Sequence, residues 1–271
     1  MVKKFLTVLM LSMFITSGSA FAADIDLGEG YHVPASFDKI LITSSDGTAI
    51  QNAVEHIQSG GTISLSGDFK LKKDSINIKK NLTLRGEGSA ILDRSSATKK
   101  DRVIRCQGNI TLENLTIIGG NSTNGGGVKL DGGTVKIISC DIHGNTGVFG
   151  GGGIHSQAKT LELTSCDISN NSSMLAGGGI SAISGTITMT SCNFTGNEAQ
   201  YSYGGGIGVS GSTVTINNCK ITGNSAPQSN GGGIALISSA SVTATSCDIS
   251  ENTASASADV YFDNTSAYTA N

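Results

Sequence analysis

The chain has 271 residues, a formal net charge of −3 and 37 glycines. Charged residues make up 14% and apolar residues 38%, which excludes a charge-rich disordered chain, a membrane helix bundle and, with so much glycine, an ordinary helical protein. Tryptophan is absent and aromatic residues make up 5%, so the core must be built from small aliphatic side chains. We expect one all-β domain.

The first 22 residues have the three parts of a secretory signal peptide. Lys3 and Lys4 precede an apolar run over residues 5–15, and residues 20–22 are the small-x-small sequence of a cleavage site. No later stretch approaches the roughly 18 apolar residues that a spanning helix needs. We therefore expect an exported bacterial protein, secreted or held at the cell surface or in the periplasm, without a transmembrane segment in the mature chain.

Residues 23–45 are expected to form an N-terminal extension, and residues 46–102 a cap with the first coils. Asp46 is a suitable helix N-cap, and Ile50, Val54 and Ile57 follow it on one helical face. Segments 60–65, 76–78 and 81–93 follow this helix. A helix in this place would cover the open end of a repetitive core.

Five cysteines recur at nearly equal intervals, and each begins one phrase of the sequence. In this phrase an aliphatic or aromatic residue follows the cysteine after two positions and an asparagine after five. An alternating strand precedes each cysteine, and Gly-Gly-Gly segments ending in Ile or Val separate successive phrases. The repeated residues are Cys140, Cys166, Cys192, Cys219, Cys247 and Asn145, Asn171, Asn197, Asn224, Asn252. A period of roughly 26 to 28 residues is typical of a solenoid.

Equivalent residues of stacked coils lie about 4.8 Å apart, so the asparagines are expected to form an amide ladder at a turn. Leu115 occupies the cysteine position of an earlier coil, which indicates that this column faces inward. We predict an all-β fold, a right-handed single-stranded parallel β-helix with a short N-terminal capping helix. Its repeat coils span residues 103–264, and residues 265–271 form a C-terminal tail.

The Phe/Ile-x-x-Asn and Gly-Gly-x-Ile motifs resemble the repeats of chlamydial polymorphic outer membrane proteins, and more broadly β-helical autotransporter passengers of the pectin lyase-like superfamily. The resemblance covers residues 103–264. The phrase at residues 194–197 has the literal Phe, whereas the others have Ile, and a third Gly replaces the usual Ala of the family. The resemblance implies an exported, non-enzymatic protein for surface adhesion or display, contacting partners through its outer sheet faces and loops.

Many proteins of this superfamily act on polysaccharides, so a carbohydrate-active lyase or hydrolase is the alternative. The arginines that a lyase would use, at positions 85, 94, 102 and 105, precede the regular coils. Asp141 and Asp167 lie one coil apart, which favours either a cation or raised-pKa site or simply solvated turn residues. His143 and His155 have no partner at a recognisable spacing and are interpreted as surface residues. We predict no catalytic residue, metal or cofactor.

The cysteines allow two interpretations. They are either buried, reduced and hydrophobe-like, or one or two pairs from adjacent coils form disulfides. Cys106 lies off the ladder, because its separation from Cys140 does not match the repeat period. A line of thiols lacks the tetrahedral arrangement of a zinc site.

Charge is unevenly distributed: residues 70–105 carry a net +7 and residues 106–271 a net −6. The basic end predicts either a contact surface for an anionic glycan, lipopolysaccharide or host matrix, or merely lysines that keep outer faces soluble and protect sheet edges. The candidate ligand-binding residues are Lys70, Lys72, Lys73, Lys79 and Lys80. Nucleic acid is not an expected partner, since aromatic and arginine platforms are lacking.

Overall fold

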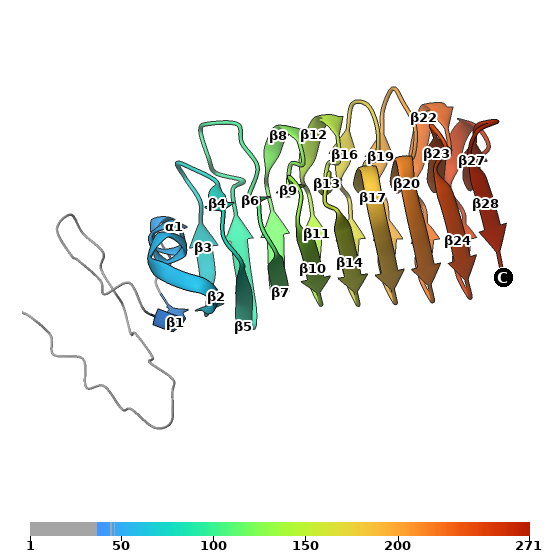
Figure 1. The fold of residues 1–271 in the computed structure, drawn as a ribbon. Helices are drawn as coiled ribbons and strands as arrows, with labels where there is room; N and C mark the ends of the chain where they lie inside the picture. The colour runs from blue at the N-terminus through green and yellow to red at the C-terminus, as the bar shows by residue number, and fades with distance from the viewer. Residues whose placement is uncertain (1–36, 44, 46) are drawn as a thin grey trace, which may run out of the picture.

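The computed structural model describes residues 37–43, 45 and 47–271, and these form a solenoid of stacked coils with one helix at its N-terminal end (Figure 1). The predicted signal peptide lies outside the described residues. All strand pairs are parallel, and each strand pairs with its equivalents in the coils before and after it. The predicted parallel β-helix with a capping helix is confirmed.

Three outer faces run along the solenoid. Face A consists of β4 (Ile76–Ile78), β6 (Ile104–Cys106), β9 (Val128–Leu130), β13 (Ile154–Ser156), the first parts of β17 (Ile180–Thr190) and β20 (Ile207–Asn217), β23 (Ile234–Ile237) and β27 (Val260–Phe262). Face C consists of β3 (Asp68–Lys70), the second parts of β5 (Leu82–Asp93) and β7 (Ile110–Ile118), β11 (Asp141–His143), β15 (Asp167–Ser169), β18 (Asn193–Thr195), β21 (Lys220–Thr222) and β25 (Asp248–Ser250).

Face B lies between them along each coil. It consists of β1 (Phe37–Ile42), β2 (Ile57–Leu65), the first parts of β5 and β7, β10 (Thr134–Ile138), β14 (Thr160–Thr164), the second parts of β17 and β20, β24 (Ser241–Thr245) and β28 (Ala267–Ala270). A separate small sheet closes the coils between faces C and A. Its strands are β8 (Asn121–Asn124), β12 (Thr146–Gly150), β16 (Ser172–Ser173), β19 (Glu198–Ala199), β22 (Ser225–Asn230) and β26 (Thr253–Ala256).

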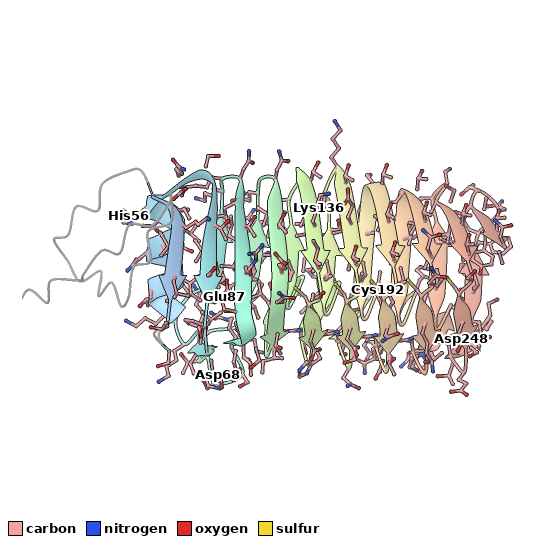
Figure 2. All side chains as sticks on the ribbon, turned by 90° about the horizontal axis from the view of Figure 1, so that it is seen from below. His56, Asp68, Glu87, Lys136, Cys192 and Asp248 are labelled. Atoms are coloured by element: carbon pink, nitrogen blue, oxygen red, sulfur yellow. The ribbon has the colours of Figure 1, made fainter. Side chains whose placement is uncertain are left out.

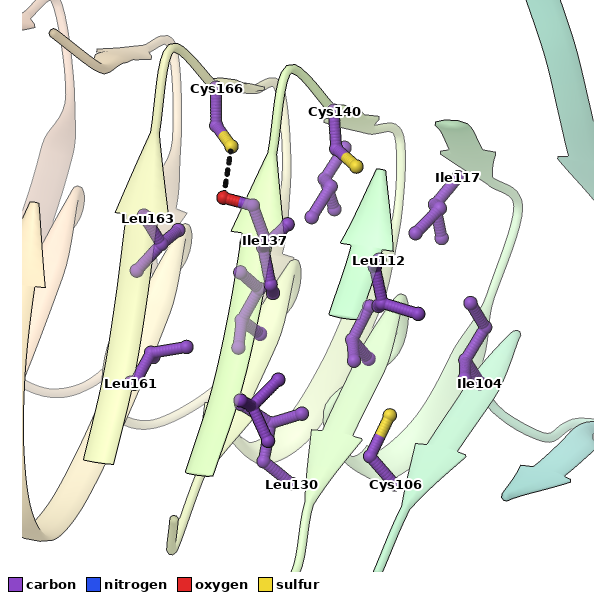
Figure 3. Packing of buried hydrophobic residues seen from close by; sticks show 14 of the residues in the cluster. Ile104, Cys106, Leu112, Ile117, Leu130, Ile137, Cys140, Leu161, Leu163 and Cys166 are labelled. Atoms are coloured by element: carbon purple, nitrogen blue, oxygen red, sulfur yellow. Dashed lines mark hydrogen bonds between the residues drawn. The ribbon is translucent and has the colours of Figure 1, made fainter. Parts of the chain in front are cut away.

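The core follows from alternation along each strand. In β10, Val135 and Ile137 are fully buried, whereas Lys136 between them is exposed. The same arrangement recurs in every coil, so aliphatic side chains stack into continuous internal columns (Figure 3) and polar side chains project outward around the ribbon (Figure 2). On face C the internal column is Ile142, Ile168, Phe194 and Ile221, each fully buried. Contact between adjacent coils therefore buries the apolar surface that no single coil can cover.

Glycine triplets allow the return from the small sheet to face A. Gly177 has a φ of +65°, a conformation that residues with a Cβ rarely adopt. The next residue, Gly178, lies so close to the following coil that a Cβ would fall 2.4 Å from the carbonyl oxygen of Glu198. Equivalent glycines in the neighbouring coils have the same environment, which explains the repeat of three.

The repeated asparagines form a continuous buried column. Each Nδ2 donates to the Oδ1 of the next asparagine, at 2.9–3.1 Å, and also to a backbone carbonyl of the preceding coil. Each Oδ1 also accepts the backbone N–H of the preceding asparagine. The column begins at the N–H of Gly120 and ends at the carboxylate of Asp259. Every amide in it is satisfied inside the protein.

The cysteines are free, and five of the six are buried. The column of repeated cysteines faces inward, and the Sγ of Cys166 donates to the carbonyl oxygen of Ile137 at 3.2 Å (Figure 3). Burial raises the pKa of the Cys140 thiol to about 12. Cys106 lies on face A between Ile78 and Leu130, in a different column. The buried thiols pack as small hydrophobic groups.

The helix α1 (Gly47–His56) packs against β1, β2 and β4 through the buried Ile50 and Val54. Ile57, predicted on the helical face, is instead the first residue of β2. Within the predicted extension, residues 37–42 form β1 and pair with β2, and within the predicted tail, residues 267–270 form β28 and pair with β24. Both segments thus belong to the solenoid. Among the described residues, no helix has the length and hydrophobicity of a bilayer-crossing segment.

Replacing Asn197 by Ala should lower the free energy of unfolding by about 3 kcal/mol, because it leaves buried donors and acceptors of Asn171, Asn224 and the Ile168 carbonyl without partners. Urea denaturation of the purified protein measures the change. Asn193→Ala, at an exposed position of β18, is the matched control and should cost about 0.5 kcal/mol at most. Equal losses in the two variants would contradict a stabilising role for the column.

Candidate functional site

A cavity of about 610 Å³ lies at the N-terminal end of the solenoid, between the start of α1 and the segment that joins β3 to β4. The helix approaches this segment closely because it begins with Gly47, where a Cβ would fall 2.1 Å from the Cδ2 of Leu71. The cavity is lined by Ser45, Gly47, Thr48, Gln51, Asn52 and residues 70–76. We call it the cap cavity.

Three of the five lysines predicted to bind a ligand line the cap cavity: Lys70, Lys72 and Lys73. The ammonium of Lys70 forms an ion pair with Asp93 at 2.5 Å, and this hydrogen bond raises the pKa of Lys70. Lys72 and Lys73 are exposed, and neither forms an ion pair with any residue in the described part of the chain. Two ammonium groups are therefore available to a ligand.

The other two predicted lysines lie elsewhere. The Nζ of Lys80 donates to the carbonyl oxygens of Glu55 and Ile57, both at 2.8 Å, so it neutralises the C-terminal end of α1. Lys79 follows β4, is exposed and does not line the cavity. The five lysines thus do not form one surface, although their proximity in sequence suggested it.

Two further features add positive charge near the cap cavity, which Asp74 also lines. The first turn of α1 lines it, and a helix N-terminus carries a partial positive charge. Behind the segment with the lysines lies Arg94, which is 2% exposed and whose Nη2 donates to the carbonyls of Lys99 and Lys73, at 2.9 and 3.4 Å. Its Nε and Nη1 have no partner among the described residues. Since no carboxylate in the described chain pairs with this buried guanidinium, its field adds to that of the lysines.

Acidic residues meet on face C. Asp141 and Asp167 are register partners in adjacent coils, and the column continues with Asn193, Lys220 and Asp248. Burial and the charge of Asp141 raise the pKa of Asp167. His143 is the last residue of β11, and its Nε2 lies 3.7 Å from the Oδ2 of Asp141. No group of three or more potential metal ligands occurs in the part of the chain that the structure describes.

His155 was predicted to be a surface residue, and this is wrong. It is 5% exposed, and the backbone at Gly150, the last residue of β12, lies so close to its ring that a Cβ there would fall 3.3 Å from its Nδ1. Burial lowers the pKa of His155 to about 4, and the nearby Lys129 adds to this effect. Its register partner is Ser181 in the next coil, a correspondence that the repeat itself could have revealed.

The arginines are also placed differently from the prediction. Arg85 and Arg105 lie in β5 and β6, within the regular columns of faces B and A. Arg85 pairs with Glu113 at 2.9 Å and Arg105 with Asp131 at 2.5 Å, each in the next coil. These guanidinium groups therefore join adjacent coils.

A protein-family model described as a right handed beta helix region matches residues 152–271. The match agrees with the pectin lyase-like superfamily at the level of the fold. The crystal structure of Escherichia coli YbhC is similar over 84% of this chain and 77% of that chain, with 14% sequence identity and a TM-score of 0.42. No curated protein gives a significant match. Residues 152–271 are thus similar to a right-handed β-helix region, and the described chain as a whole has the parallel β-helix fold.

Because the pKa of His155 falls from 6.5 to about 4 on folding, the unfolded chain binds the proton more tightly. The free energy of unfolding is therefore not reduced by His155 above pH 6.5. As the pH falls toward 4, protonation of this residue in the unfolded chain lowers the free energy of unfolding by about 3 kcal/mol in all. His155→Gln should remove that loss, measured as the change in urea midpoint between pH 7 and pH 4.5. An unchanged pH dependence in His155→Gln would contradict the assignment.

Proposed function

We propose that this protein is an exported, non-enzymatic β-helix that serves surface adhesion or display, and that it binds an anionic glycan or a host-matrix surface. The observation that carries the proposal is the cap cavity, where Lys72 and Lys73 face a ligand-sized space without an acidic partner among the described residues. The motif resemblance to polymorphic outer membrane proteins and autotransporter passengers supports the same function.

The chemistry of the cap cavity suits carboxylate or sulfate groups. Two free ammonium groups, the N-terminal turn of α1 and the buried Arg94 all favour negative charge. Gln51 and Asn52 add neutral amides that hydrogen-bond hydroxyl groups. Repeating acidic sugars therefore match the site better than an isolated ion, since they supply both kinds of group.

The double variant Lys72→Ala/Lys73→Ala should bind heparin or polygalacturonate at least ten-fold more weakly than the parent, because both free ammonium groups are removed. Surface plasmon resonance on immobilised polysaccharides and matrix proteins measures the affinity, and parental binding should weaken with salt. Lys79→Ala/Lys159→Ala removes the same charge from exposed positions outside the cavity and should have little effect. Absence of parental binding, or equal loss in both variants, would contradict the proposed site.

A carbohydrate-active enzyme is the second candidate, and the Asp141–Asp167 pair favours it. Adjacent carboxyl groups, one of them with a raised pKa, can act as acid and base or nucleophile in glycoside hydrolysis. Against this candidate, Arg85 and Arg105 are held in ion pairs and the basic residue of the same column, Lys220, lies two coils from Asp167.

If this second candidate is correct, the protein incubated with a panel of acidic and neutral polysaccharides releases reducing or unsaturated sugars from at least one of them. Asp141→Asn and Asp167→Asn should each lower the rate of release at least 100-fold. Asp248→Asn, at an exposed position of the same column, should leave the rate unchanged. Product release that persists in the Asp141 and Asp167 variants would point to a contaminant. Binding without products would favour adhesion.

A further inference from the structure

Large exposed hydrophobic side chains gather at one place outside the cap cavity. Among the described residues six such side chains are strongly exposed, and four of them lie together next to the small sheet. They are Phe149, Met174, Leu175 and Tyr201, exposed by 59%, 43%, 39% and 47%. We call these four residues the apolar ridge. Single exposed hydrophobic residues need no explanation, whereas a cluster marks an interaction site.

The ridge crosses three successive coils in register. Leu175 donates its N–H to the carbonyl of Val148, and Tyr201 donates to the carbonyl of Met174, at 3.2 and 2.9 Å. In this parallel ladder these bonds place Phe149, Leu175 and Tyr201 at equivalent positions, next to the bridge between Gly150 and Ala176. The adjacent strands β12, β16 and β19 lie side by side along the solenoid (Figure 1).

The fold does not require apolar residues at this place. In the next coil, the corresponding strand β22 contains Pro227, Gln228 and Ser229 and still pairs with β26. The ridge side chains point away from the core, which is filled by other residues. The stability of the fold therefore does not explain why these four exposed residues are apolar.

The surroundings of the ridge are almost without charge. The connections at residues 144–153, 170–179 and 196–206 contain no Lys or Arg and one acid, Glu198. An anionic membrane surface attracts Lys and Arg side chains, and these connections contain none. A stable protein partner needs about 20–30 residues on each side, far more than four. The size and neutrality of the ridge thus favour a small, uncharged ligand with apolar faces.

We propose that the apolar ridge binds an uncharged glycan by stacking. Sugar rings present C–H groups on their faces, and these pack on the electron-rich faces of aromatic rings. Phe149 and Tyr201 are two coils apart, about 9.6 Å, so their rings contact alternate units of an extended oligosaccharide while Leu175 packs between them. Gln200 and Ser202 beside Tyr201 supply hydrogen-bonding groups for sugar hydroxyls. This site is separate from the cap cavity and does not depend on it.

The test is binding of cellohexaose, chitohexaose, laminarihexaose and maltohexaose to the full chain by calorimetry. At least one should bind, with an affinity that high salt does not reduce. Phe149→Ser/Tyr201→Ser should weaken it at least ten-fold, whereas Phe149→Tyr/Tyr201→Phe, which keeps both rings, should bind within two-fold of the parent. Phe262→Ser removes an exposed ring of β27 outside the ridge and should bind like the parent.

Melting curves of each variant show whether it is folded, and the ring-keeping variant separates loss of stacking from loss of structure. The proposal is overturned if none of the four oligosaccharides binds, or if Phe262→Ser weakens binding as much as the ridge variant. It is also overturned if the ridge substitutions leave the affinity for oligosaccharides unchanged but abolish binding of the protein to phosphatidylcholine vesicles. The same holds if they leave that affinity unchanged but abolish a dimer detected by analytical ultracentrifugation. Lys72→Ala/Lys73→Ala should not alter this affinity, so failure here leaves the cap cavity unaffected.

Discussion

The structure depends on the register between coils. Parallel backbone hydrogen bonds repeat along all faces, and the buried asparagine column fixes which residue of one coil faces which residue of the next. A slip of one position would turn every inward aliphatic side chain toward solvent and leave the buried amides unpaired. Because this constraint involves a few positions of each coil, the outward residues and loops are free to differ from coil to coil. Binding chemistry is expected at those free positions.

What the sequence could reveal was the part of the molecule that repeats. Cys166 and Asn171 have the same neighbours as Cys192 and Asn197, so spacing alone placed them in inward columns and predicted the amide hydrogen bonds that the structure contains. Alternation likewise distinguished the inward Val135 from the outward Lys136. The cap helix was recognisable from its apolar face, although its end was misplaced by one residue at Ile57.

The features that do not repeat were missed, each for a physical reason. His155 was wrongly predicted to be a surface residue, because its spacing from possible partners carries no sign that the backbone at Gly150 lies close to its ring. Lys80 belongs to the basic segment and was therefore predicted to bind a ligand. The hydrogen bonds of its Nζ with the carbonyls at the end of α1 depend on tertiary structure, which the sequence pattern does not show. Arg85 and Arg105 belong to coils without the cysteine phrase, so no repeat marked them. Phe149 and Tyr201 occupy equivalent positions of their coils but differ in residue type.

The arrangement of charge along the axis connects the two proposed sites. The net +7 of residues 70–105 is concentrated in the first coils, and the net −6 of residues 106–271 in those that follow. Ion pairs between adjacent coils, such as Arg85–Glu113 and Arg105–Asp131, neutralise part of the positive charge of residues 70–105. Lys72 and Lys73 form no ion pair within the described chain. In the binding that we propose, an anionic polymer is attracted to the cap and repelled by the carboxylates of Asp141 and Asp167. The uncharged ridge lies in those same later coils, where a neutral glycan meets no such repulsion, so one rigid axis can hold two ligands of different charge at separate positions.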